Sequence, residues 1–242
     1  MKIIQLTDLH LFSDRTQKLF GVVTYDSLNK IIDHLLINEG DYDAIILTGD
    51  ISQDETIESY QLANEMLMRL NKPIHYIHGN HDYKSNLDLI FNIHNPIENL
   101  SIPYWDFISV DTVEYGKDSG FISDKEFSLL KKKISESKEN NIALVMHHHC
   151  LKLGTPLIDE CMLLNNNQLL KFIGGENKIK LIICGHAHGD YKLKYNNSML
   201  EVCPAVCFQW KKGTKTPIVE NVSGYRKFSF FKENYLSETI MI

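Results

Sequence analysis

Clusters of Asp, His and Asn side chains recur five times between residues 8 and 188, each directly after a short apolar run. The clusters are Asp8-Leu9-His10, Gly49-Asp50, Gly79-Asn80-His81-Asp82, His147-His148-His149 and Gly185-His186-Ala187-His188. Imidazole, carboxylate and carboxamide donors without a thiolate suit borderline divalent ions such as Mn, Fe, Co or Zn, and suit Ca or Mg poorly. One donor each from Asp8, His10, Asp50, Asn80, His186, His188 and one histidine of 147–149 gives seven, which are too many for one tetrahedral ion. Shared between two ions, they leave positions open for water, and Asp50 has the two oxygens needed to bridge.

Short apolar runs precede these clusters and predict buried strands. The runs cover residues 3–7, 44–48, 74–78, 142–146 and 180–184. In an open α/β sheet, ligands bind at the carboxyl ends of the strands, where all five clusters lie. Asp8 and His10 are two residues apart, so in an extended chain their side chains leave the same face. His186 and His188 repeat that spacing.

Helical periodicity separates the early strands. Apolar residues fall on one face between 28 and 36 and again between 57 and 70. Ser123 followed by Glu126 is a capping-box start to a further helix, which comes after a strand-like run at 107–110. Alternating strands and helices indicate a largely parallel sheet with helices packed outside it.

The C-terminal third is predicted to be mostly antiparallel. Residues 191–195 and 198–202 read as a hairpin around Asn196-Asn197, and further strands are expected at 205–210 and 225–231. Two sheets stacked face to face, with helices on both outer sides, accommodate both halves. No linker rich in Gly, Pro or Ser marks a boundary, so residues 1–242 are expected to form one α/β domain.

Composition excludes several classes of protein. The 242 residues are 43% hydrophobic and 23% charged, as in an ordinary globular protein, and the formal net charge of -6 argues against binding nucleic acid by counterion release. The apolar runs are too short to cross a membrane, and a carboxylate at Asp8 interrupts any signal sequence. Five cysteines without CxxC spacing fit reduced thiols. We expect a cytoplasmic protein without a membrane or nucleic-acid partner, as a monomer or a homodimer.

The ordered motifs resemble those of the calcineurin-like metallophosphoesterases, whose pattern is D-x-H, G-D, G-N-H-[DE], H and G-H-x-H. The match is complete and spans residues 8–188. The resemblance implies a four-layer αββα sandwich and two metal ions, Mn, Fe or Zn. It implies that one ion binds Asp8, His10, Asp50 and His188, and that the other binds Asp50, Asn80, His147 and His186.

A closer resemblance is to the bacterial class III cyclic-nucleotide phosphodiesterases, the cyclic-AMP group. The further shared stretches are Leu19-Phe20-Gly21-Val22-x-Thr24, Met146 to His149, Leu157-Ile158-Asp159 to Leu164-Asn165-Asn166, and Cys207-Phe208-Gln209-Trp210. Cys150 stands where the group has proline, and little chain follows the last predicted strand. The resemblance implies hydrolysis of a 3′,5′-cyclic nucleotide such as cyclic AMP to the nucleoside 5′-monophosphate by a hydroxide that bridges two ions.

Residues beside the ligands receive predicted roles. Spacing does not decide which of the three adjacent histidines binds metal, but the family register points to His147. His149 is then a substrate or supporting residue, and His148 packs on the opposite side of the strand. The family places His81 at the phosphate or the leaving oxygen, so Asp50 and His81 are the predicted catalytic residues.

Other contacts stay open at this level. Asn80, His81 and His149 are the predicted substrate contacts. Asp82 either orients His81 or a neighbouring loop, or caps a helix over residues 84–91. Aromatic residues within 20–25 and 208–210 are candidates for stacking on a base. Two alternative functions use the same fold: a glycerophosphodiesterase or broad phosphodiesterase, and a catalytically inactive scaffold. A nuclease is disfavoured by the acidic charge.

Overall fold

Two six-stranded sheets lie face to face in the computed structural model, which describes residues 1–242 and all side chains except those of Asn99 and Ser101. The first sheet has the order β16 (Tyr235–Met241), β15 (Gly224–Phe230), β1 (Lys2–Leu6), β4 (Ala44–Thr48), β5 (Ile74–Ile77), β6 (Asn95–Pro96). The second has the order β11 (Tyr191–Tyr195), β12 (Ser198–Val202), β10 (Ile179–Cys184), β9 (Asn141–Val145), β8 (Trp105–Ser109), β7 (Ser101–Ile102). Each sheet has a parallel centre and antiparallel strands at an edge.

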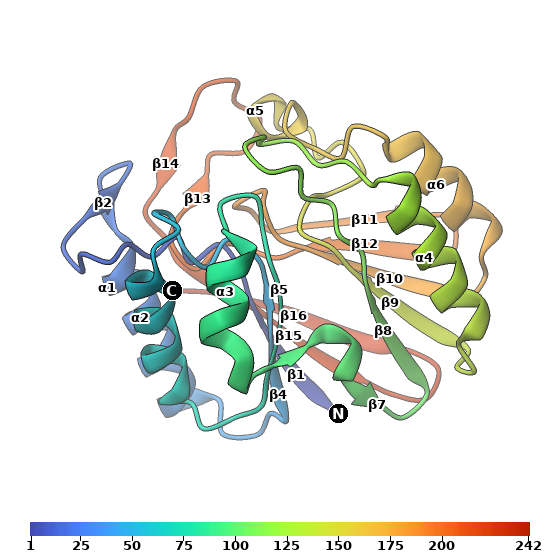
Figure 1. Ribbon diagram of the computed structural model, residues 1–242, viewed down its shortest axis with the longest axis horizontal. Helices are drawn as coiled ribbons and strands as arrows, with labels where there is room; N and C mark the ends of the chain where they lie inside the picture. Colours follow the sequence, from blue (N-terminus) through green and yellow to red (C-terminus); the bar gives the residue numbers. More distant parts are fainter.

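Helices cover the outer faces of both sheets (Figure 1). The helices on the first sheet are α1 (Thr24–Asn38), α2 (Ile57–Met68) and α3 (Lys84–Ile90), and those beside the second are α4 (Asp124–Glu136), α5 (Pro156–Asp159) and α6 (Asn166–Gly175). Short 3-10 turns follow at η1 (Phe91–Ile93) and η2 (Ile97–Asn99). Two small hairpins complete the fold: β2 (Lys18–Leu19) with β3 (Val22–Val23), and β13 (Gln209–Trp210) with β14 (Val219–Glu220).

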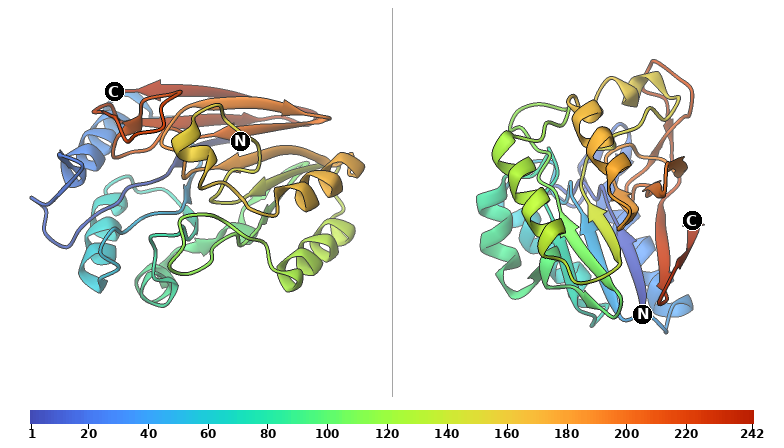
Figure 2. Two further views of the ribbon diagram at one scale, coloured as in Figure 1. Left: turned by 90° about the horizontal axis from the view of Figure 1, so that it is seen from above. Right: turned by 90° about the vertical axis from the view of Figure 1, so that its right-hand side faces the viewer.

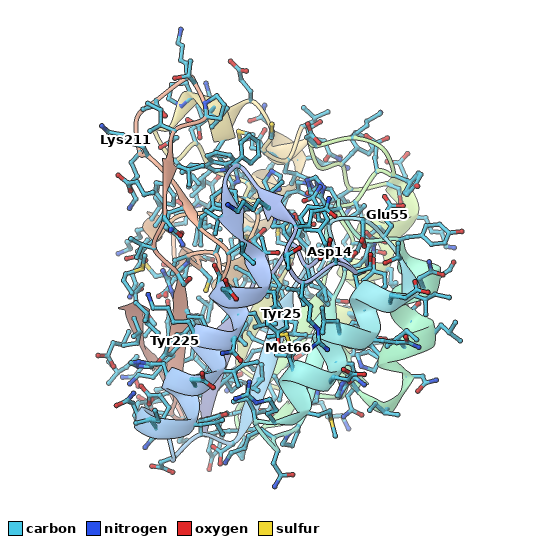
Figure 3. The ribbon with its side chains drawn as sticks, turned by 90° about the vertical axis from the view of Figure 1, so that its left-hand side faces the viewer. Asp14, Tyr25, Glu55, Met66, Lys211 and Tyr225 are labelled. Atoms are coloured by element: carbon cyan, nitrogen blue, oxygen red, sulfur yellow. The ribbon has the colours of Figure 1, made fainter. Side chains whose placement is uncertain are left out.

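Alternating side chains explain why the central strands are apolar throughout. Ile4 of β1 and Ile45 of β4 pack toward α1 and α2, whereas Ile3 and Ile46 pack against the second sheet. Both faces of each central strand are therefore buried. Figure 3 shows α1 and α2 from outside, with Tyr25 and Met66 in the apolar cluster between them. The predicted αββα sandwich is confirmed.

A buried ion-pair network joins the two sheets near their C-terminal strands. Arg226 of β15 is fully buried and donates from Nη1 to Glu201 of β12 at 2.5 Å. Its Nη2 donates to Asp190, directly before β11, and to the carbonyl of Val202 at 2.9 Å. Tyr235 of β16 donates its hydroxyl to the same glutamate at 2.8 Å. In Figure 2, the red strands β15 and β16 lie beside the orange strands β11 and β12.

Two elements differ from those predicted. The strand expected at 205–210 is reduced to β13, because the backbone before it bonds to the loop after β1: Val206 N donates to Thr7 O at 2.9 Å and Cys207 N donates to Asp8 O at 3.2 Å. The chain also continues into β16, which the sequence reading did not predict. Across the described residues, no helix has the length and apolar character needed to cross a membrane.

Candidate metal centre

The carboxyl ends of β1, β4, β5, β9 and β10 meet at one edge of the sandwich, in the upper part of Figure 1. Bonds between the loops fix their register: Asp8 N donates to Gly49 O at 3.0 Å, and His10 N donates to Asp50 O at 2.9 Å. Five residues there have left-handed backbone with φ between 43° and 68°: Asp8, His10, Asp50, His186 and His188. Such backbone is uncommon outside glycine and is concentrated at functional sites.

All three motif glycines are required by crowding between these loops, and a Cβ at Gly49 would collide with the ring of His147 and the backbone of Gly79. A Cβ at Gly79 would collide with the Asp50 carboxylate and with the ring of His147. A Cβ at Gly185 would collide with the hydroxyl of Thr7. The glycines thus permit the close approach that brings the clusters together.

The first group of donors surrounds a pair of facing imidazoles. His10 Nε2 and His188 Nε2 are 3.1 Å apart. The Oδ1 atom of Asp8 lies 3.7 Å from His188 Nε2 and 4.0 Å from His10 Nε2. Asp50 Oδ2 lies 3.6 Å from His10 Nε2. The structure therefore brings together all four residues predicted for one ion.

The second group shares Asp50 with the first. Asp50 Oδ2 lies 3.2 Å from His147 Nε2. Asn80 Oδ1 lies 3.0 Å from that same nitrogen and 3.1 Å from His186 Nδ1. All seven predicted ligands are buried, with none more than 8% exposed.

Outer contacts fix which ring nitrogen of each histidine carries the proton. His147 Nδ1 donates to Thr48 O at 2.7 Å, and His188 Nδ1 donates to Phe208 O at 3.1 Å. His186 Nε2 donates to the carbonyl of Cys161 at 3.1 Å. A carbonyl only accepts, so in the neutral rings the inward nitrogens present lone pairs. Lone pairs facing one another and two carboxylates form a donor set that fits divalent cations.

Burial controls the protonation of the histidines. It lowers the pKa of His10 to about 4 and holds the pKa values of His186 and His188 well below the usual range, so these three rings are neutral at pH 7. Burial acts in the same direction on His147, but the adjacent Asp50 outweighs it and raises the pKa of His147 to about 9. A cation that binds this ring must displace its proton.

The two carboxylates are affected in opposite directions. Burial, with the charge of Asp50, raises the pKa of Asp8 to about 7. Burial also opposes ionisation of Asp50, yet His147 and His10 hold the pKa of Asp50 well below its usual range. Asp50 is therefore the charged carboxylate between the two groups of donors.

The other two histidines of the triplet are not among the predicted ligands, although His148 has a ring nitrogen within 4.8 Å of nitrogens of His147 and His186. The ring of His148 is 4.5 Å from that of His186 and its Nδ1 contacts Thr112 Oγ1 at 2.8 Å, so it does not point to the opposite side of the strand as expected. His149 is fully buried, and neither of its ring nitrogens has a hydrogen-bond partner among the described residues. Its role in substrate binding stays a prediction.

Sequence reasoning missed Gln53, which connects two site histidines. Its Oε1 lies 2.7 Å from His10 Nδ1, and its Nε2 lies 3.2 Å from His81 Nδ1. With the amide in this orientation, His81 accepts at Nδ1 and carries its proton on Nε2. The backbone N–H of His81 also donates to Asp50 Oδ1 at 2.9 Å. A glutamine three positions after Asp50 carries no signal that would separate it from an ordinary loop residue.

Asp82 orients loops and does not cap a helix. Its carboxylate accepts from the N–H groups of Ile51 and Ser52 at 3.0 Å and from that of Gly79 at 2.9 Å. The N-cap position of α3 is Tyr83. Of the roles predicted for Asp82, the orientation of a neighbouring loop is confirmed and the capping role is wrong, and its carboxylate contacts these loops and the hydroxyl of Tyr60 in place of His81.

A cavity of about 500 Å³ opens over the donors. His10, Asp50, Asn80, His81, His186 and His188 line its polar end. Its other walls are mainly apolar and aromatic, and include Leu19, Phe20, Leu157, Trp210 and Pro217, with Gln53 and Asp118 as the polar exceptions. The cavity therefore has room for a small molecule that has an anionic group and an apolar body.

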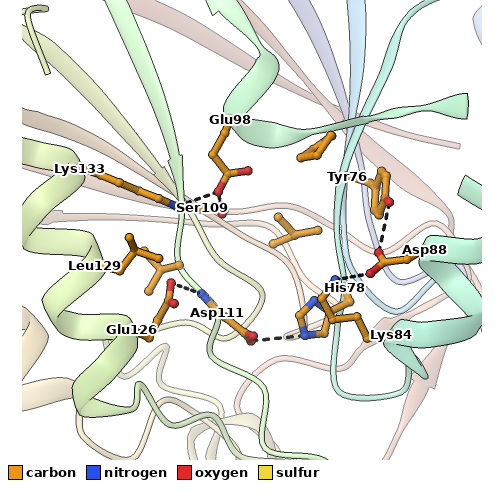
Figure 4. A pocket seen from close by; sticks show the side chains of 13 residues that line it. Tyr76, His78, Lys84, Asp88, Glu98, Ser109, Asp111, Glu126, Leu129 and Lys133 are labelled. Carbon is orange, nitrogen blue, oxygen red and sulfur yellow. Dashed lines mark hydrogen bonds and ion pairs between the residues drawn. The ribbon is translucent and has the colours of Figure 1, made fainter. Parts of the chain in front are cut away.

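Figure 4 shows a second cavity, of about 400 Å³, between α3 and α4. Its charged side chains pair with one another: Lys84 with Asp88 at 2.5 Å, Lys133 with Glu98 at 2.9 Å, and His78 with Asp111 at 3.3 Å. These pairs satisfy each other, so this cavity lacks the unmatched donors of the first.

Comparison with known proteins gives consistent matches. The family model described as calcineurin-like phosphoesterase matches residues 1–190. A probable cyclic nucleotide phosphodiesterase of Xenorhabdus bovienii is 35% identical over 237 residues, covering 95% of this chain and 96% of the relative. The 3′,5′-cyclic adenosine monophosphate phosphodiesterase CpdA of Haemophilus influenzae is 30% identical, covering 87% and 78%. A dimetal phosphatase from Danio rerio shares the fold, with a TM-score of 0.69 at 11% identity, covering 100% and 98%.

Proposed function

Because the chain belongs to the calcineurin-like phosphoesterase family and is a metal-dependent phosphodiesterase, we propose that it hydrolyses 3′,5′-cyclic nucleotides to nucleoside 5′-monophosphates, with cyclic AMP as the first candidate. The family resemblance read from the motifs is confirmed. The proposal rests on one observation above all, the convergence of two donor groups on Asp50 beneath a cavity with an apolar wall. The names of the relatives support the choice of substrate.

We assign the donors to two divalent ions, Mn, Fe or Zn. Asp8, His10 and His188 would hold one ion. Asn80, His147 and His186 would hold the other, and Asp50 would be shared by both. Ions at these positions would activate water and neutralise phosphate charge. The outer contacts of the histidines orient the rings toward the ions before they bind.

His81 is the proposed hydrogen-bond donor to the leaving oxygen. The hydroxyl of water adds to phosphorus, the bond from phosphorus to O3′ breaks, and the remaining proton of water ends on O3′. Gln53 donates to Nδ1 of His81, which places the N–H of that ring on Nε2, and His81 lines the cavity. A donor placed at an alkoxide as it forms lowers the barrier because the bond strengthens in the transition state. Asn80 also lines the cavity, which leaves its Nδ2 group available to a phosphoryl oxygen.

A substrate panel on one set of samples tests the function. Metal-free protein is reconstituted separately with Mn, Fe and Zn, and metal content is measured by elemental analysis. Each sample is assayed with cyclic AMP, cyclic GMP, a glycerophosphodiester and bis-p-nitrophenyl phosphate. We expect two ions per chain and turnover of cyclic AMP to 5′-AMP. Two bound ions with a preference for the glycerophosphodiester would instead establish that alternative, and protein that binds no metal would establish the inactive scaffold.

A further inference from the structure

The β2–β3 hairpin has an unusual residue at its tip. Leu19 pairs with Val22, so Phe20 and Gly21 form a two-residue turn, with φ of 48° and 88°. Positive φ at both positions is typical of a type I′ turn, which favours Asn-Gly, Asp-Gly or Gly-Gly. A bulky aromatic in the left-handed region is an outlier. Phe20 is also 58% exposed, so burial does not account for its presence.

The ring of Phe20 is held over the metal-site cavity by other aromatic residues. It packs edge-on against Trp210, with ring centroids 5.0 Å apart, and against Phe208 at 5.9 Å. These two rings reach His188, with centroids 5.7 Å and 4.9 Å from the imidazole. A continuous series of rings therefore leads from a proposed metal ligand to the hairpin tip.

An apolar cluster anchors the hairpin beside the C-terminal segment. Val22 packs with Ala205, Cys207 and Phe208, and Leu19 packs against the same cluster. Figure 1 shows β2 on the same side of the molecule as β13 and β14. The strands of the hairpin are thus anchored by apolar packing, while much of the Phe20 ring at its tip is left accessible.

We propose that Phe20, with Trp210 as the adjoining wall, is the stacking site for the base of the substrate. This inference rests on the proposed function and deepens it, because it names the part of the nucleotide that the apolar end of the cavity recognises. Every base has a π-face, so stacking tolerates different bases. The site therefore selects diesters that carry a base over those that do not, and discriminates weakly between cyclic AMP and cyclic GMP.

The best test removes the ring without disturbing the turn. Phe20→Asn creates Asn-Gly, the favoured type I′ pair, so the hairpin is retained. Two competitive inhibitors report on the base: 5′-AMP, and ribose 5-phosphate, which has the same phosphate and sugar but no base. Both inhibition constants are measured against bis-p-nitrophenyl phosphate, together with kcat and KM for cyclic AMP.

We expect Phe20→Asn to raise the inhibition constant of 5′-AMP and the KM for cyclic AMP by roughly fivefold or more each, as for loss of one base–aromatic stack. The inhibition constant of ribose 5-phosphate and the melting temperature should stay unchanged, and Phe20→Trp should bind 5′-AMP like the wild type. Phe231→Ala removes another half-exposed phenylalanine, outside the cavity, and is the matched control.

If Phe20→Asn raised the inhibition constants of 5′-AMP and ribose 5-phosphate equally, or raised neither, the stacking site would be overturned. A wild type that is inhibited by 5′-AMP but does not hydrolyse cyclic AMP would refute the proposed function and still leave the effect of Phe20→Asn measurable. The two failures are therefore distinguishable.

Discussion

At the scale of single residues, Asp50 is the residue that the two donor groups share. One of its oxygens faces His10 and His147, and the other accepts from the backbone of His81. Its φ of 54° limits the substitutions that leave the loop intact. Asparagine tolerates this conformation, so it tests the charge of the side chain and not the backbone.

We predict that Asp50→Asn lowers kcat at least ~1,000-fold, because the charge shared by both ions is lost together with the electrostatic stabilisation that depends on them. Elemental analysis should find fewer than the two ions of the wild type. Asp41→Asn, at an exposed carboxylate, is the control and should keep both metal and activity. Full metal content with near-normal turnover in Asp50→Asn would disprove the bridging role.

A second prediction concerns the hydrogen bond that His81 donates to O3′. We expect His81→Asn to lower kcat for cyclic AMP by roughly 100-fold, as for loss of one hydrogen-bond donor to a developing oxyanion. Bis-p-nitrophenyl phosphate should be affected much less, because its leaving phenolate is stable without such a donor. His34→Asn, on α1, is the control. The same loss with both substrates would show that His81 acts on the phosphate and not on the leaving oxygen.

The donors could be predicted from sequence, whereas their supports could not. Motif residues such as Asp8 and His188 have types and spacings that point to metal chemistry. The groups that orient them include the carbonyls of Thr48 and Phe208, and every residue has a carbonyl. Gln53 acts through its position alone. Only the three-dimensional path of the chain shows which of these groups reaches a ring nitrogen.

At the scale of elements, the strands before the clusters were predicted because burial on both faces gives continuous apolar runs. The segment 205–208 is equally apolar, but the N–H groups of Val206 and Cys207 bond to the loop after β1 and not to a neighbouring strand. Strand β16 lies at a sheet edge, and its residues are half-buried or exposed. Its sequence therefore lacks the continuous apolar run of the central strands. Apolar patterning reports burial, and burial does not specify the hydrogen-bond partner.

Asp54 joins two loops beside the site and gives a prediction about pH. It accepts from the backbone and hydroxyl of Ser13 and from those of Thr56, the N-cap of α2. Partial burial opposes ionisation, but these hydrogen bonds outweigh it and lower the pKa of Asp54 from 3.8 to about 2. A folded-state pKa below the unfolded one stabilises the protein above about pH 4, and this stabilisation is lost as the pH falls toward 2.

Asp54→Asn should therefore reduce the free energy of unfolding at pH 7 by about 1 kcal/mol, the usual net value of a hydrogen bond. The difference from wild type should shrink as the pH falls from 4 to 2. Urea unfolding at several pH values measures it, with Asp26→Asn on α1 as the control. A difference that stays constant down to pH 2 would contradict the assignment.

At the scale of the whole molecule, the two sheets are joined by apolar packing and by the buried Arg226–Glu201 pair. Breaking one partner of such a pair leaves a buried charge without compensation. Arg226→Met should destabilise the fold by about 3 kcal/mol, and the double variant Arg226→Met with Glu201→Met should recover much of that loss. Urea unfolding of both variants tests this.

Lys227→Met provides the control for this pair. Lys227 is the next residue on the same strand and forms partly exposed pairs with Glu39 and Glu238, which contribute about 0–1 kcal/mol. If Lys227→Met lowered the free energy of unfolding as much as Arg226→Met, burial of the Arg226–Glu201 pair would not be the cause of the loss of stability.

Gly79 and Gly185 bear on how the motifs themselves should be read. Neither has a side chain to contribute, yet an added methyl group at either position would displace Asp50 or Thr7 from its place. A saturation screen for activity should thus reject alanine at these glycines as firmly as it rejects changes to the histidines. Intolerance to substitution within such a motif measures steric crowding as well as chemistry, so it does not by itself count the groups that hold the ions.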